Sequence, residues 1–424
     1  MKKTNNNNHL FKKSMNKLAV TIGVISGSLV LLTPAAQAAE TQYSFGGFVK
    51  ADAIFSQYSD QQRAGNVGDD FIVPSTTAVG DGSNKGDVVF DSHARTSRLF
   101  FKTVTETDAG EVKTHVEMDF NDSNSNERLT NQSSSGLRHA FVSWKNSETS
   151  SILAGQTWST FFNPSALPES ADFVGTTSGT IFARQTQIRY TQNMGNGKVM
   201  FSAENPSVSL YDAGFNATNY TPAEITEGKS VSNNAYDNSG MPDLVGRYDG
   251  KTGALNYSAA AMVRQINYDY VDSDDSTIKG DNSQIGMGLT VSGKYAFSNG
   301  DDFKFMLSHG HLGRYIALNA FRDGVVEADG DIELITSMGG FVAYRHMWSD
   351  KLRSTVSYAY SEADNPDTIT TDVTKSVSNA NINLMYSPTK NLTFGGEYIL
   401  AEREVESGAD GDLNRLHLTT KWVF

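Results

Sequence analysis

The chain ends in Leu416-His417-Leu418-Thr419-Thr420-Lys421-Trp422-Val423-Phe424, and this stretch decides the fold. Even positions hold apolar or neutral residues, whereas odd positions from 415 to 421 hold polar or basic ones. Such alternation predicts a β-strand with one apolar and one polar face. A closed barrel in an outer membrane needs both faces, one toward lipid and one toward water. The closing strand of a soluble barrel or sandwich alternates in the same way and stays an alternative on this stretch alone.

The N-terminus has the pattern of an export signal. An apolar run over residues 18–32 is followed by Pro34 and by Ala36-Gln37-Ala38. The lysines before the run are Lys2, Lys3, Lys12, Lys13 and Lys17. This order is that of a Sec-type signal peptide, and the run is too short and too polar for a secure membrane anchor. We predict cleavage after Ala38, so that 1–38 is the signal peptide and 39–424 is the transmembrane barrel domain.

The composition excludes several other classes of protein. Only 38% of the residues are hydrophobic, and beyond the signal no window approaches the ~18 apolar residues of a spanning helix. The chain has no Cys, which excludes disulfides and thiolate metal sites. Removal of the five signal lysines leaves 30 of the 35 basic residues and all 48 acidic residues, which gives a net charge of −18. Nucleic acid is therefore not expected as a partner.

The mature chain contains strand candidates that alternate between short turns and longer polar loops, the pattern of an up-and-down membrane barrel. The expected strands are 43–57, 88–105, 111–121, 136–146, 149–157, 183–193, 198–205, 241–250, 254–267, 284–298, 302–315, 335–348, 352–362, 376–387, 391–405 and 412–424. Short turns fall at 107–110, 145–148, 193–197, 250–253, 298–301, 349–351 and 388–391. We predict an all-β, 16-stranded antiparallel transmembrane β-barrel with both termini in the periplasm.

The direction of the side chains follows from charge. In the first strand Phe45 and Val49 lie on one face, and Lys50 and Asp52 lie on the other. A Lys or Arg on the lipid face at mid-bilayer costs ~2–4 kcal/mol. The charged face is therefore assigned to the lumen.

The third long loop, residues 159–182, differs from the other loops, which are acidic and rich in Ser and Asn. It contains two prolines, four phenylalanines and two acids, Glu169 and Asp172. An apolar loop is poorly suited to the cell surface. We expect it to fold into the lumen, with its aromatic side chains on the wall and both acids facing the channel.

Several motifs together resemble those of general bacterial porins. They are Ser97-Arg98-Leu99-Phe100-Phe101-Lys102, Leu137-Arg138-His139-Ala140-Phe141-Val142-Ser143-Trp144, Gly155-Gln156-Thr157-Trp158 and Pro168-Glu169-Ser170-Ala171-Asp172-Phe173. With Gly47-Phe48-Val49-Lys50-Ala51-Asp52 they are most similar to DcaP-like outer-membrane porins. The resemblance covers the mature chain and is densest before residue 190. It implies a homotrimer of sixteen-stranded barrels whose third loop narrows the pore. The chain departs from that family in having only residues 39–42, and no coiled-coil segment, before the first strand.

The resemblance also implies the residues of a pore constriction. In such porins, basic residues on the second, fourth and sixth strands face acids on the third loop. The residues that match are Arg98, Lys102, Arg138 and Arg184 or Arg189 on the wall, and Glu169 and Asp172 on the loop. The motif favours Arg184, whereas alternation with Ile188 and Tyr190 favours Arg189, so both are kept.

The function that the resemblance implies is passive diffusion of small hydrophilic solutes, with a preference for anions such as dicarboxylates. A net charge of −18 favours cations unless the acids lie outside the pore. They do crowd the long loops, for example at 269–275 and 327–333. The field near the passage matters more than net charge.

Two rival classes have weaker support. An outer-membrane hydrolase would need a nucleophile element, but Gly-x-Ser-x-Gly does not occur and the histidines are scattered, so we predict no enzyme, no catalytic residues and no cofactor. A purely structural or adhesive barrel would need neither inward arginines nor a Phe/Pro-rich third loop.

Metal binding is also not expected. His309-Gly310-His311 has no evident third ligand, so no metal site is predicted there. The acidic clusters at 272–275 and 327–331 lack EF-hand spacing, although Ca²⁺ binding or a divalent bridge to lipopolysaccharide stays open. The expected location is the outer membrane of a Gram-negative bacterium, in contact with lipid and lipopolysaccharide.

Overall fold

The computed structural model describes residues 40–60, 70–121, 133–215, 239–271, 277, 279–369 and 372–424. The predicted signal peptide and the acidic cluster at 272–275 lie outside these residues. None of the helices within the described ranges has the length and apolarity needed to cross a bilayer.

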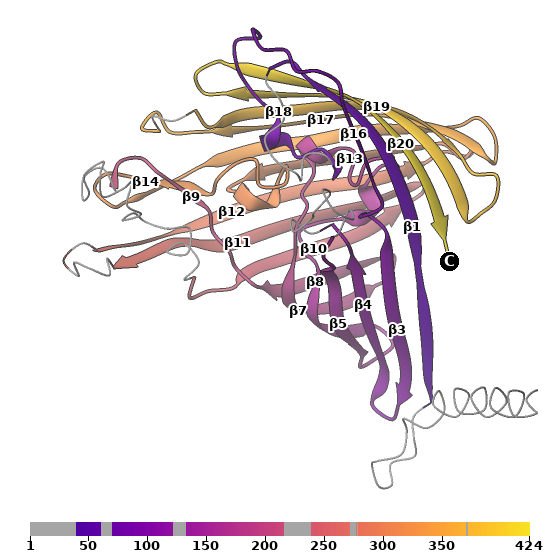
Figure 1. The fold of residues 1–424 in the computed structure, drawn as a ribbon. Helices are drawn as coiled ribbons and strands as arrows, with labels where there is room; N and C mark the ends of the chain where they lie inside the picture. The colour runs from indigo at the N-terminus through magenta and orange to yellow at the C-terminus, as the bar shows by residue number, and fades with distance from the viewer. Residues whose placement is uncertain are drawn as a thin grey trace, which may run out of the picture.

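The described strands form a closed antiparallel barrel (Figure 1). The first strand, β1 (Thr41–Tyr58), pairs with β3 (Arg98–Thr107) on one side and with the last strand, β20 (Asp410–Val423), on the other. Figure 1 shows β1 in indigo beside β20 in yellow. Beyond β3, the short β2 (Val89–His93) continues along β1, so β2 and β3 occupy one position in the wall.

The remaining wall strands follow in chain order. They are β4 (Gly110–Asp119), β5 (Gly136–Lys145), β6 (Ser150–Trp158), β7 (Arg184–Met194), β8 (Gly197–Glu204), β10 (Asp243–Thr252), β11 (Leu255–Val271), β12 (Lys279–Ala296), β13 (Asp302–Gly310), β16 (Thr336–Met347), β17 (Leu352–Asp364), β18 (Thr374–Tyr386) and β19 (Leu392–Val405). The predicted 16-stranded antiparallel barrel is therefore confirmed.

The structure differs from the predicted strands in three places. The strand expected over 88–105 is divided into β2 and β3. The strand expected over 302–315 ends at Gly310, whose φ of 130° suits glycine, and the 3-10 helix η5 (Gly313–Tyr315) follows. In the loops, β9 (Leu210–Asp212), β14 (Gly324–Val326) and β15 (Ile332–Leu334) form a separate small sheet. These strands are too short for alternation to reveal them in the sequence.

The wall is apolar outside and much of its inward face is polar, as the alternation predicts. In β20, Leu416 and Leu418 are exposed at 40% and 43%, whereas Arg415 and His417 are fully buried. Aromatic side chains lie beside the short turns, where Trp144 Nε1 donates to the Ala109 carbonyl at 2.7 Å. Such outward aromatics near strand ends are typical of a membrane interface.

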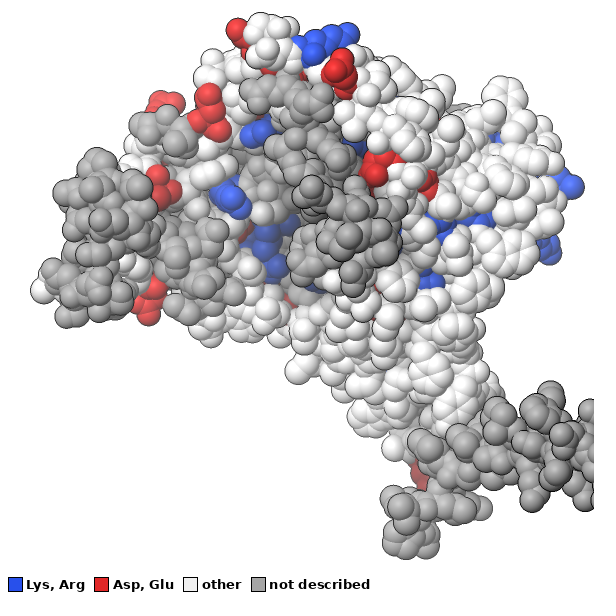
Figure 2. Space-filling model, viewed as in Figure 1, with Lys and Arg blue, Asp and Glu red and all other residues white. Residues whose placement is uncertain are grey.

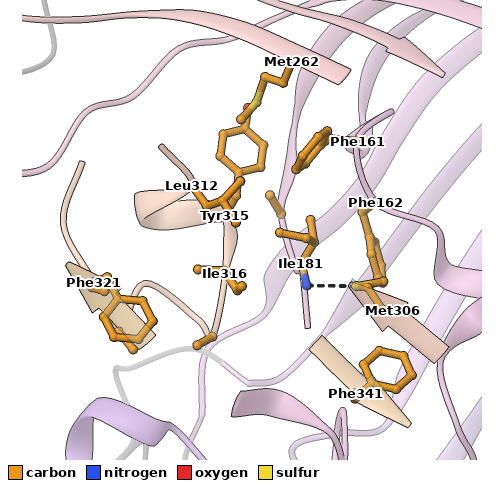
Figure 3. Packing of buried hydrophobic residues seen from close by; sticks show 14 of the residues in the cluster. Phe161, Phe162, Ile181, Met262, Met306, Leu312, Tyr315, Ile316, Phe321 and Phe341 are labelled. Carbon is orange, nitrogen blue, oxygen red and sulfur yellow. Dashed lines mark hydrogen bonds between the residues drawn. The ribbon is translucent and has the colours of Figure 1, made fainter. Parts of the chain in front are cut away.

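Two loops pack together against the inward faces of the wall. Loop 159–183 joins β6 to β7, and loop 311–335 joins β13 to β16. Ile181 and Ile316 form a β-bridge between them, and Phe182 N donates to the Tyr315 carbonyl at 2.8 Å. Figure 3 shows the apolar core that the loops build with inward side chains of the wall strands, among them Met262, Met306 and Phe341.

Candidate functional site

A cavity of about 340 Å³ lies between residues 167–174 of loop 159–183 and the wall formed by β1, β3, β18, β19 and β20. It is on the side of the barrel away from much of the apolar core, to which β10, β11, β13, β16 and β17 contribute. Figure 2 shows several basic side chains in the central part of the visible face, with others at its top and right edges, and acidic side chains mostly at its left and top.

Three cations line this cavity on neighbouring strands. Lys50 of β1 is directly opposite Lys421 of β20, and Phe48 of β1 is directly opposite Arg98 of β3. The Phe48 ring centre is 5.3 Å from Arg98 Cζ and 4.2 Å from Lys421 Nζ. Closure of the barrel through β1 and β20 thus brings together residues from both ends of the mature chain.

The three cations differ in how far their charge is compensated. Lys50 Nζ is 2.7 Å from the buried Asp52 carboxylate. The nearest carboxylate to Arg98 is that of Glu117, at 3.8 Å. Lys421 forms no ion pair within the part of the chain that the structure describes. Arg98 and Lys421 therefore present the least compensated positive charge to the cavity.

Arg138, expected on the basic wall, does lie on the inward face of β5 but is 1% exposed. Its guanidinium contacts Glu117 at 2.9 Å and Asp119 at 2.5 Å. The Phe173 ring of loop 159–183 lies 5.3 Å from Arg138 Cζ. Two carboxylates and one aromatic ring thus separate this cation from the cavity.

The other predicted cations do not line the cavity. Arg184 lies 5.2 Å from the Trp158 ring and close enough to Arg138 to interact electrostatically. Arg189 faces inward, as alternation predicts, but its charged neighbours include Glu204 and Arg247. Lys102 lies 4.2 Å over the Phe100 ring. Arg184 is thus near Arg138, whereas Arg189 lies elsewhere on the wall.

Both predicted loop acids line the cavity, and both are engaged. Glu169 forms a bidentate ion pair with Arg353 of β17, at 2.6 and 2.5 Å. Asp172 accepts hydrogen bonds from the backbone N–H groups of Ile72, at 3.1 Å, and Phe173. These contacts of Glu169 and Asp172 hold loop 159–183 against β17 and against Ile72.

Glu397 of β19 is a further residue that positions the loop, and sequence reasoning missed it. Its buried carboxylate accepts from Ser170 Oγ and from Ala171 N, both at 2.7 Å. Asn381 and Asn383 of β18 also donate to it, at 2.6 and 3.1 Å. Alternation places all three side chains inward, but only the structure shows that they meet the loop.

The cations that line the cavity carry donors that suit carboxylates. Within the described ranges, no three His, Asp or Glu side chains come together as a metal-binding group.

Comparison with known proteins gives the family. The model of the DcaP outer membrane protein family matches residues 15–213 and 215–424. The crystal structure of the outer membrane channel DcaP of Acinetobacter baumannii is 22% identical, with a TM-score of 0.70 over 93% of this chain and 100% of that chain. Outer-membrane OmpT of Vibrio cholerae is 11% identical, with a TM-score of 0.51 over 92% and 99% of the two chains. A search of curated proteins found no match. At these identities the structures show a shared fold alone, whereas the family model spans nearly the whole sequence; the chain belongs to the DcaP outer membrane protein family.

Proposed function

We propose that the protein is a passive channel through the outer membrane for small hydrophilic solutes, with a preference for anions such as dicarboxylates. The observation that supports this most is the pair of weakly compensated cations, Arg98 and Lys421, at the cavity beside loop 159–183. A similar solved structure is named as an outer membrane channel, which supports the general function.

Local charge supports an anion preference in spite of the net charge. Three basic side chains of β13, β16 and β17 are engaged with a loop or a carboxylate. Arg353 binds Glu169, Arg345 binds Asp302, and Lys304 donates to the Leu167 carbonyl. Among the cations that line the cavity, Lys50 is paired with Asp52, so the least compensated positive charge there is at Arg98 and Lys421.

The spacing of these cations supports dicarboxylates among the anions. The two distances to the Phe48 ring centre, 5.3 and 4.2 Å, place Arg98 Cζ and Lys421 Nζ at most 9.5 Å apart. One extended solute with two carboxylates can contact both cations at this separation. A neutral solute gains nothing from either.

The test is reconstitution of the purified protein in planar bilayers and in liposomes. We expect stepwise currents, a reversal potential in a KCl gradient that favours Cl⁻, and faster entry of succinate than of a neutral solute of similar size. Absence of stepwise currents would favour the structural or adhesive barrel. A preference for K⁺ would overturn the anion assignment.

Two further expectations complete the proposal. The mature protein should begin at Ala39, which the mass of the outer-membrane form will test. A trimer is expected in detergent, and one similar Vibrio cholerae structure is described as a trimer form. A monomeric mass at all detergent concentrations would exclude it.

A further inference from the structure

Loop 311–335 occupies the barrel interior as fully as loop 159–183 does. Tyr315, Ile316, Ala317 and Val325 are fully buried, and they lie in the apolar core of Figure 3. The wall strands β10, β11, β13, β16, β17 and β18 contribute inward apolar side chains to the same core. A dry core of this kind excludes water and ions from that part of the lumen.

We infer that loop 311–335 is a second constriction element, which sets the size limit of the pore by filling this part of the lumen and by fixing loop 159–183. The inference rests on the proposed channel function. It assigns size selection to both loops and charge selection to Arg98 and Lys421.

The two loops are joined directly. Besides the Ile181 and Ile316 bridge, Ala317 N donates to the Thr180 carbonyl at 3.1 Å. The rings of Phe161 and Tyr315 are 5.9 Å apart and nearly perpendicular. A displacement of loop 311–335 would therefore expose the apolar residues of loop 159–183 and loosen it.

A buried charge cluster attaches loop 311–335 to the wall. Arg264 of β11 lies 2.5 Å from Asp323 of the loop and 3.6 Å from Asp243 of β10, and all three side chains are fully buried. Tyr315 Oη donates to Asp243 at 2.7 Å. Arg314 also lies 3.4 Å from Asp243. Removing Asp323 therefore leaves two cations beside one carboxylate, and the excess buried charge destabilises the packed arrangement. The cluster is thus one of the contacts that keep the loop inside, together with the apolar core.

The backbone of the loop is strained where it turns. Ala317, Leu318 and Asn319 have φ values of 49°, 52° and 63°, the left-handed region that residues with a side chain seldom adopt. Such a conformation persists only when surrounding contacts impose it. Loss of the buried charge cluster would therefore also release this strain, and both effects favour the displaced loop.

The test uses single-channel conductance and entry of neutral sugars into liposomes. In Asp323→Asn the released part of the lumen should raise conductance about twofold or more and admit a trisaccharide that the wild type excludes. Entry of a neutral sugar depends on the size of the pore and not on the charge of its wall. Asp350→Asn, an equal change in an exposed turn, is the matched control and should behave as the wild type.

A reversible variant separates displacement of the loop from misfolding. The chain has no Cys, and paired residues of an antiparallel β-bridge have the Cα separation that a disulfide needs. In Ile181→Cys/Ile316→Cys/Asp323→Asn, oxidation should restore the wild-type size limit, and a reductant should abolish it again. Wild-type conductance and sugar exclusion in reduced Asp323→Asn variants would overturn the inference. Absence of currents in the wild type would instead refute the proposed channel.

Discussion

Replacement of Lys421 by Gln is expected to remove much of the anion preference without changing the barrel. An anion about 4 Å from an ammonium group gains ~1 kcal/mol in bulk water and ~4 kcal/mol at an effective dielectric of about 20. Lys421 is half-buried and faces a cavity, so about 1–2 kcal/mol is appropriate at this site. This energy corresponds to roughly a 5- to 30-fold change in the local anion population.

The assay is the reversal potential in a KCl gradient, from which the permeability ratio of Cl⁻ to K⁺ follows. The permeability ratio of Cl⁻ to K⁺ should fall at least about fivefold in Lys421→Gln at low ionic strength. The fall should be smaller at high salt because the charge is screened. Lys421→Arg keeps the charge and should keep the ratio.

The matched control is Lys375→Gln. Lys375 is exposed at the start of β18, pairs with Glu404 at 2.8 Å, and is not among the residues that line the cavity. It should leave the permeability ratio unchanged. If Lys421→Gln changes the ratio no more than Lys375→Gln does, then Lys421 does not act on permeating ions and the reasoning from local charge is refuted.

Three other perturbations test the remaining contacts. Glu397→Ala removes the acceptor that holds residues 170 and 171, so single-channel currents should become larger and noisier, and unchanged currents would mean that other contacts suffice. Arg353→Gln leaves Glu169 without its bidentate partner, which should shift the reversal potential toward cation preference; a shift toward anions would contradict this. Hydrogen bonds from Tyr344 Oη and from a backbone N–H hold the pKa of Asp301, in the turn before β13, well below its usual range. The ionised form therefore stabilises the fold above the unfolded pKa of about 3.9, and this stability is lost as pH falls through the lower folded pKa. Asp301→Asn should lower the thermal unfolding temperature at pH 7 and lose less stability than the wild type between pH 7 and pH 2; an equal loss in both would exclude this role.

Much of the wall could be read from the sequence because its signals are local. Alternation has a period of two, so Leu416 and Leu418 face outward whenever Arg415 and His417 face inward. The short turn predicted at 107–110 joins β3 to β4, and the one predicted at 250–253 lies within two residues of the observed connection between β10 and β11. Strand order then follows from the chain itself.

The cation pairings could not be read in this way. Arg98 and Arg138 both occupy inward positions, but one is nearly free and the other is compensated by Glu117 and Asp119. Which carboxylate reaches which guanidinium depends on side-chain lengths across neighbouring strands. Alternation gives only the face.

The backbone of loop 311–335 could not be predicted from alternation either. Its first residues continue the apolar pattern of β13, which led to a predicted strand over 302–315. The chain instead turns inward after Gly310, and Tyr315 and Ile316 are buried against loop 159–183. Contacts between distant loops decided this outcome.

The sequence by itself predicted an export signal, and it determined the class of fold, the number of strands and the face of most wall residues, although it left Arg184 and Arg189 open. These depend on composition, periodicity and turns, which are properties of short segments. Only the tertiary structure decided that Lys421 from the last strand lies beside Lys50 from the first, and that Glu169 binds Arg353. Closure of the barrel and packing of loops inside it join residues that are hundreds of positions apart, and no local pattern specifies such contacts.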